Sequence, residues 1–182
     1  MAHEQTDEDL MRAAQAGELD ALGALFSRHH RRVHALCYRL TGDAAAAEDL
    51  TQESFLRIIR YRESFGGRAK FTTWLYRVVR NRCVDYHAAN KREIERRDIM
   101  AHDPTVQKTA TDSGNERHEM LRGALDRLPA PMREVLVLSR YQGLKYREIA
   151  ELCEESVGAV KVRAHRAMRE LRRIVLELEQ EL

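Results

Sequence analysis

Residues 57–97 combine cations and aromatic rings in a pattern that suits single-stranded nucleic acid. This segment carries 12 Lys and Arg against 4 Asp and Glu. It also holds six of the chain's 11 aromatic residues: Tyr61, Phe65, Phe71, Trp74, Tyr76 and Tyr86. Cations pair with phosphates, and unstacked bases stack on rings at about 1–3 kcal/mol per base, whatever the base. The segment is therefore predicted to bind single strands. The alternative for Trp74 is a purely structural place in the core, which is the commoner role of a lone Trp.

Residues 145–173 predict a second, different nucleic-acid surface. A short helix, a tight turn and a longer helix are expected here, as in a helix-turn-helix. Residues 156–173 hold six Lys and Arg against Glu170 alone. Opposite the apolar stripe, helical spacing places Gly158, Val162, Arg166, Arg169 and Arg173, with Ala159 and His165 beside them. Small residues let a recognition helix enter the major groove, and long donors reach bases and phosphates. The alternative is a solvated basic face on an ordinary amphipathic helix.

The elements that position these residues are expected to be helices throughout. Thr6 and Asp9 have the spacing of a capping box, and Gly42 can end the helix that carries the next apolar series. Asp43 is a candidate cap for a third helix. Gly66 and Gly67 then break the chain before the basic and aromatic helix.

The apolar rhythm stops between about residues 98 and 115 and then resumes. An unstructured segment of that length is uncommon inside one compact domain. We therefore predict two small helical domains, residues 1–97 and 117–182, joined by a flexible linker at 98–116. In the second domain Pro131 suits the first turn of a helix, and Gly143 is expected to end that helix. The fold class is all-α, with a helix-turn-helix as the second domain.

Composition excludes several classes of protein. Three widely spaced cysteines, a polar beginning and no long apolar run predict a cytoplasmic protein without disulfides or membrane spans. No phosphate-binding Gly loop or nucleophile motif is present, so we expect no enzyme, no cofactor and no small-molecule substrate. His30, His34 and Cys37 have helical spacing, but no fourth zinc ligand is evident, and we expect no metal site.

Three motifs carry a family resemblance. Residues 47–57 (AEDLTQESFLR) resemble the segment by which bacterial sigma factors grip the clamp of RNA polymerase. Residues 71–81 (FTTWLYRVVRN) resemble their strand-melting helix. Residues 128–136, 146–150 and 156–163 resemble their C-terminal helix-turn-helix. The order, the intervening linker and the short length are similar to the extracytoplasmic-function (ECF) type.

The resemblance implies roles for the first domain. Core RNA polymerase is expected to be contacted by Asp49, Gln52, Glu53, Phe55 and Leu56. The loop from Ser64 to Lys70 is expected to capture a flipped base of the minus-ten promoter element. The minus-ten contacts that the resemblance implies are Ser64, Phe65, Arg68, Lys70, Phe71, Trp74, Arg77, Arg80 and Asn81.

The second domain is expected to read the minus-thirty-five element of promoter DNA as a duplex. The residues implied are Ser156, Gly158, Ala159, Lys161, Val162, Arg163, His165, Arg166 and Arg169. The same resemblance implies an anti-sigma factor as a further partner. It also implies that the protein directs promoter-specific initiation of transcription.

Two positions depart from the family pattern. The turn of the helix-turn-helix usually carries Gly followed by an apolar residue, but here it carries Glu154 and Glu155. A left-handed residue other than Gly costs about 1 kcal/mol, so a differently shaped turn is expected. Lys145 stands where the family usually has a Ser or Thr helix cap. Loss of such a cap costs about 1 kcal/mol of stability. The main rival interpretation is an independent helix-turn-helix regulator whose first domain senses a signal or dimerises.

Overall fold

The described residues of the computed structural model, 5–98 and 116–180, form helices and no strand. The elements are α1 (Asp7–Gln15), α2 (Leu19–Thr41), α3 (Ala44–Tyr61), the short 3-10 helix η1 (Arg62–Ser64), α4 (Phe71–Asp98), α5 (Glu116–Asp126), α6 (Ala130–Leu136), the π-helical turn η2 (Val137–Tyr141), α7 (Tyr146–Cys153) and α8 (Val157–Gln180). The all-α prediction is confirmed. None of the described helices is long and apolar enough to cross a membrane.

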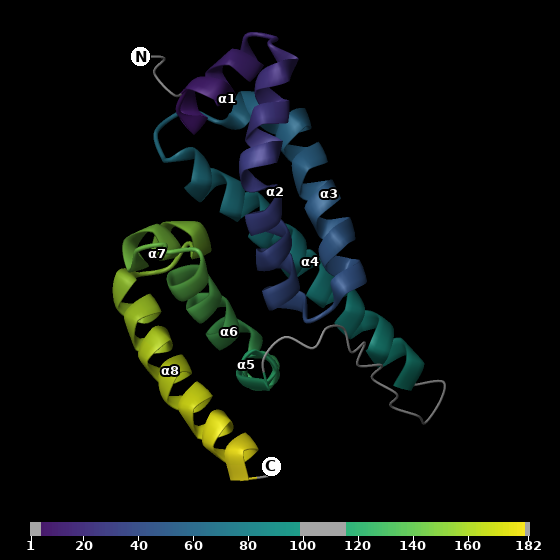
Figure 1. The fold of residues 1–182 in the computed structure, drawn as a ribbon, viewed down its shortest axis with the longest axis vertical. Coiled ribbons are helices and arrows are strands. Elements are labelled where there is room, and N and C mark those ends of the chain that lie inside the picture. The colour runs from purple at the N-terminus through teal and green to yellow at the C-terminus, as the bar shows by residue number, and fades with distance from the viewer. Residues whose placement is uncertain (1–4, 99–115, 181–182) are drawn as a thin grey trace. The chain divides into compact units, whose positions relative to one another are not determined.

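The chain separates into two compact units (Figure 1). Unit 1 contains α1, α3, α4 and most of α2, and unit 2 contains α5 to α8. The predicted linker, 98–116, lies almost wholly outside the described residues. The expectation of two small helical domains is confirmed, while the bounds 1–97 and 117–182 stay a prediction, because the division assigns residues 38–44 to unit 2.

The core of unit 1 lies where one apolar face of each helix meets the others. Its fully buried side chains come from all four helices: Met11, Leu25, Val33, Leu36, Ile58, Phe71, Leu75 and Val79. Two hydroxyl groups are buried on α3 without being left unpaired, because Thr51 donates to the carbonyl of Ala47 and Ser54 to that of Leu50, each at 2.6 Å. The outer faces of the helices remain available for partners.

Local capping signals set the helix ends in unit 1 as expected. The Thr6 hydroxyl accepts the Asp9 N–H at 3.1 Å, and the Asp9 carboxylate accepts the Thr6 N–H at 3.2 Å. This is a complete capping box. The Thr6 hydroxyl also donates to the Asp9 carboxylate at 2.6 Å, and this bond, followed by that from the Thr6 N–H, holds the pKa of Asp9 below its usual value. Gly42 has φ of 74°, the left-handed geometry that ends α2, and α3 begins two residues later.

Unit 2 is built around α8, which packs against α5, α6 and α7. Its core joins Leu125 and Leu128 to Val135, Leu136, Leu138, Ile149, Leu152, Val160, Ala164, Ala167 and Ile174. Pro131 lies in the first turn of α6, and Gly143 has φ of 71° just after η2. Both predictions about this helix are therefore confirmed.

The turn between α7 and α8 keeps a left-handed geometry despite lacking Gly. Glu154 has φ of 58° and ψ of 42°, and the N–H of Glu155 donates to the carbonyl of Ala150 at 2.9 Å. The expectation of a differently shaped turn was wrong, because the backbone bonds that close α7 outweigh the steric cost at Glu154. At the start of α7, Glu148 accepts the Lys145 N–H at 2.7 Å, but no side chain caps the helix at Lys145.

Candidate nucleic-acid and polymerase interfaces

The solvent face of α3 carries the acidic segment. Asp49, Gln52 and Glu53 are exposed, and Leu56 adds an apolar side chain that is 65% exposed. Phe55 differs from the expectation because its ring is buried edge-on against Phe26 of α2, with ring centroids 4.8 Å apart. Phe55 therefore supports this face from below and does not form part of its surface.

Glu53 has a partner within unit 1. Its carboxylate accepts from the Arg82 guanidinium of α4, with Nε at 2.9 Å, and Arg82 also donates to Asp85 at 3.0 Å. Helical spacing places Arg82 on the apolar side of α4 and can indicate Asp85, three residues on, but not Glu53. Because that partner lies 29 residues away, helix periodicity alone could not identify it. The acidic face of α3 is thereby joined to the basic helix.

Ser64, at the end of η1, is exposed, and so are Arg68 and Lys70 in the loop between η1 and α4. Ser64 donates to the carbonyl of Tyr61 at 2.7 Å, which holds η1 onto the end of α3. Gly67 has φ of 67°, and this positive value lets the chain reverse before α4. The loop thus exposes two cations on a bend that its own backbone defines.

Three aromatic rings meet at the start of α4. The Trp74 ring lies 5.6 Å from that of Phe65 and 6.0 Å from that of Phe71, measured between centroids. Phe71 is 0% exposed and Phe65 only 5% exposed, so neither reaches a base from this position. The expected DNA contacts of these two rings are corrected to packing beneath Trp74, which itself is half-buried.

The rest of the outer face of α4 is mainly polar. Arg77 and Asn81 are exposed and Arg80 is half-buried, on the same helix as Trp74. Thr73, which helical spacing also places on this face, is 3% exposed and belongs to the core. The buried surface of α4 therefore extends around the helix as far as Thr73, beyond the apolar stripe that the sequence pattern indicates.

Ser156 has a structural role at the start of the expected recognition helix, α8. Its hydroxyl oxygen accepts the Ala159 N–H at 3.1 Å, the bond of a helix N-cap. Gly158, Ala159 and Lys161 are exposed in the first turns, together with Val162, which is 52% exposed. Small and apolar surface therefore occupies the N-terminal end of α8, as a helix that enters a groove requires.

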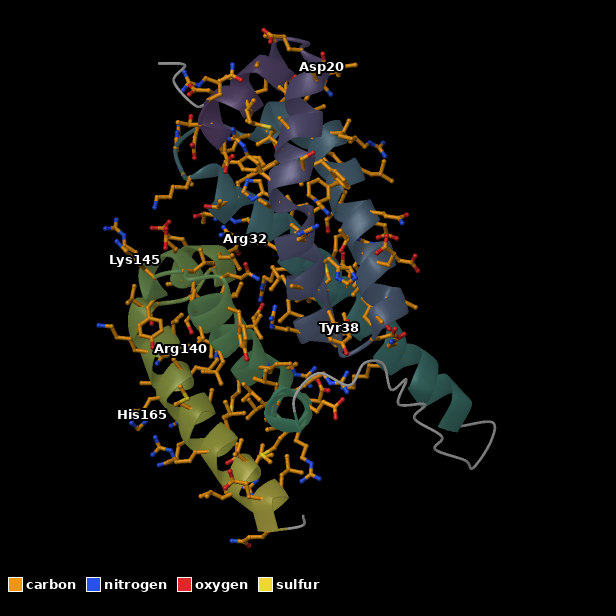
Figure 2. The ribbon with its side chains drawn as sticks, viewed as in Figure 1. Asp20, Arg32, Tyr38, Arg140, Lys145 and His165 are labelled. Atoms are coloured by element: carbon orange, nitrogen blue, oxygen red, sulfur yellow. The ribbon has the colours of Figure 1, made fainter. Side chains whose placement is uncertain are left out.

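The cations farther along α8 differ in how they are held. Arg163 forms an ion pair with Glu155 of the turn, and both side chains are largely covered. Arg173 pairs with Glu170 at 2.6 Å and with Glu177, and these carboxylates raise the pKa of Arg173 above its ordinary value. Arg166, Arg169 and His165 are exposed, and His165 points from α8 into solvent, as does Lys145 before α7 (Figure 2).

A shallow hollow of about 470 Å³ adjoins this face. Pro129, Pro131 and Met132 form one wall, while Gly158, Ala159, Val162, Arg163 and Arg166 form the other. The hollow has an apolar floor and a cationic rim. It can receive the methyl groups and phosphates that line a major groove.

The comparisons with known proteins cover both units. The Sigma-70 region 2 family matches residues 25–93, and the Sigma-70 region 4 family matches residues 118–171. The ECF RNA polymerase sigma-E factor of Haemophilus influenzae is 34% identical over 92% of this chain and 94% of that protein. The RNA polymerase sigma factor CarQ of Myxococcus xanthus is also 34% identical, over 91% of this chain and 95% of that protein.

A solved structure shares the fold. The sigma factor RpoE of Bartonella quintana, in complex with the anti-sigma factor NepR, aligns with a TM-score of 0.71. It is 22% identical, and the alignment covers 84% of this chain and 95% of that one. Both of the predicted family regions are thus present, in the predicted order and over nearly the whole length of the relatives. The chain belongs to the sigma-70 family of RNA polymerase sigma factors and is a factor of the ECF type.

Proposed function

We propose that this sigma factor divides promoter recognition between its two units. Residues 1–97 bind core RNA polymerase and open the minus-ten element, and residues 117–182 read the minus-thirty-five element as duplex DNA. Residues 98–116 connect the two. The observation that carries this proposal is the half-buried Trp74 ring, which lies against two buried phenylalanines and on the same helix as exposed cations.

The acidic face of α3 binds core polymerase. Asp49 and Gln52 supply polar contacts, and the exposed Leu56 supplies an apolar anchor. Glu53 contributes through its pairing with Arg82, which sets its direction. Phe55 holds α3 at a fixed distance from α2 through its contact with Phe26.

The minus-ten surface consists of the loop before α4 and the outer face of α4. Ser64, Arg68 and Lys70 surround a flipped base, whose extrusion costs a few kcal/mol. Trp74 stacks on the neighbouring base while Arg77 and Arg80 neutralise phosphates and Asn81 hydrogen-bonds the strand. Phe65 and Phe71 act indirectly, by fixing the Trp74 ring.

The N-terminal half of α8 enters the major groove. Gly158, Ala159 and Val162 permit close approach, and Arg166 reaches base edges from the rim of the hollow. The phosphate contacts come from Lys161, Arg163, His165 and Arg169. Ser156 fixes the start of the helix and presents its hydroxyl proton toward the backbone of the DNA.

The protein acts by binding and carries out no covalent chemistry of its own. It works in the cytoplasm, where core polymerase and the chromosome are. An anti-sigma factor is a further proposed partner, by analogy with the RpoE–NepR complex. Such a partner would keep the factor inactive by covering the surfaces described above.

Charge reversal on α3 tests the first step of this proposal. Asp49→Arg should weaken binding to core polymerase at least tenfold in a fluorescence-anisotropy titration, because an interfacial charge pair becomes a repulsion. Glu18→Arg makes the same charge change at an exposed position before α2 and should leave the affinity unchanged. Equal affinities for the two variants would remove the α3 face from the polymerase interface.

A further inference from the structure

Helix α1 lies outside the segment that matches the Sigma-70 region 2 family, which begins at residue 25. It nevertheless contacts the proposed minus-ten surface directly. The side-chain amide of Gln15 donates to the carbonyl oxygens of Arg62 at 2.8 Å and Phe65 at 3.0 Å. Arg62 lies just before the base-capturing loop, Ser64 to Lys70, and Phe65 lies within it. The Gln15 side chain of α1 thus holds the N-terminal end of that loop in place.

A second bond from α1 fixes the start of α4. The carboxylate of Glu8 accepts the N–H of Phe71 at 2.8 Å. Phe71 is the first residue of α4, where backbone N–H groups have no partner within the helix. Glu8 therefore caps α4 from another helix, and its charge also suits the positive end of the helix dipole. The loop is held at both of its ends, by Gln15 and by Glu8.

Helix α1 is itself firmly attached to unit 1. Asp7 pairs with Nε2 of His29 at 2.7 Å, and His29 is 4% exposed. The His29 ring contacts Phe71, with centroids 5.5 Å apart, and Arg28 donates to Asp7 at 3.0 Å. Because α1 cannot shift without breaking these buried contacts, its position is passed on to the loop and to Phe71.

We propose that α1 is a positioning element for recognition of the minus-ten element, with Gln15 and Glu8 as its positioning residues. Neither residue needs to touch DNA. They fix the position of Ser64, Arg68 and Lys70 relative to the Trp74 ring, which packs against Phe71. A binding site discriminates well only when its contacting groups are held to a fraction of an ångström. Fixing the loop beforehand also lowers the entropy lost on binding.

The inference rests on the proposed role of the loop and is tested with the same holoenzyme. Gln15→Glu keeps the size of the side chain but removes its donor and places a carboxylate against two carbonyls. The assay titrates holoenzyme with single-stranded oligonucleotides of the non-template minus-ten sequence, obtained by mapping transcript start sites. Each oligonucleotide is used in its native form and with one base replaced. The quantity measured is the ratio of the two affinities, from which the fraction of active protein cancels.

Gln15→Glu should lower this discrimination ratio about three- to tenfold, the effect of losing about one net hydrogen bond. Its affinity for core polymerase should stay unchanged. Arg12→Gln is the matched control, since Arg12 lies on the exposed side of α1 and pairs with Asp9. Glu8→Gln, which keeps an acceptor oxygen, should preserve the ratio, whereas Glu8→Ala should lower it. A purely structural role would lower activity without changing the ratio.

Two results would overturn the inference in different ways. If Lys70→Ala and Arg68→Ala lower the ratio while Gln15→Glu and Glu8→Ala do not, α1 has no positioning role but the loop keeps its proposed function. If none of the four substitutions changes the ratio, the loop does not read the minus-ten element, and the proposed function of this surface fails together with the inference.

Discussion

Replacing Trp74 by Ala separates strand opening from the other steps of initiation. The substitution removes a half-buried ring whose inner side packs against Phe65 and Phe71. Complete burial of a Trp is worth about 3–5 kcal/mol on replacement by Ala, so a half-buried ring should cost about 2 kcal/mol of stability. The free energy of unfolding of a typical domain is about 5–15 kcal/mol, so the variant should remain folded.

The functional loss should come from the exposed side of the ring. A base stacked on an aromatic side chain contributes about 1–3 kcal/mol, which corresponds to roughly a 5- to 150-fold change in the opening equilibrium. On duplex DNA this free energy helps to offset the unpairing of the promoter. On a template with a pre-melted bubble that cost is already met, so saturating holoenzyme should initiate almost normally.

The assay compares initiation by saturating holoenzyme on the duplex and on the bubble template. Trp74→Ala should reduce the duplex signal strongly and the bubble signal little, with unchanged affinity for core polymerase. Trp74→Phe keeps a stacking ring and should recover most of the duplex activity. Equal losses on both templates would show that Trp74 serves only the core, and a stacking role for its ring would be refuted.

Three further substitutions test other parts of the structure. Glu154→Gly should stabilise unit 2 by about 0.5–1 kcal/mol, because Gly adopts the left-handed geometry at lower cost. Slower hydrogen exchange in α7 and α8 of the full chain would be the evidence. Arg166→Ala should weaken holoenzyme binding to the upstream duplex at least about fivefold and leave promoter melting nearly unchanged. Unchanged binding on every promoter would show that Arg166 does not contact the bases. Glu53→Gln should lower the stability of unit 1 by about 0.5–1 kcal/mol through loss of its pairing with Arg82. Urea unfolding followed by the fluorescence of Trp74, the chain's single Trp, reports that unit alone, and an unchanged midpoint would count against the pair.

Local rules predicted the ends of the helices well. The capping box at Thr6, the left-handed Gly42 and Gly143, and Pro131 in the first turn of α6 all depend on residues a few positions apart. Such signals can be read directly from a sequence. The motifs of the sigma family could also be recognised, because each occupies one short continuous segment.

Other features depend on contacts between distant segments and were not predictable in the same way. Phe55, Phe65 and Phe71 were assigned to binding surfaces, but each ring turns inward to meet a partner from another element. Helical periodicity defines the border of an apolar face only to within about one residue. At that border, the packing partner determines whether a side chain is buried or exposed. The bonds of Gln15 span 47 and 50 residues, and no local pattern indicates them.

Run-off transcription with purified core polymerase tests most directly whether this protein gives RNA polymerase its promoter specificity. We expect initiation from a defined start site only when the protein is added, and little binding of the free protein to the same DNA. If the protein adds no promoter-specific initiation, yet protects duplex DNA by itself at nanomolar concentration, it acts as an independent regulator, and its role as a promoter-specificity factor is contradicted.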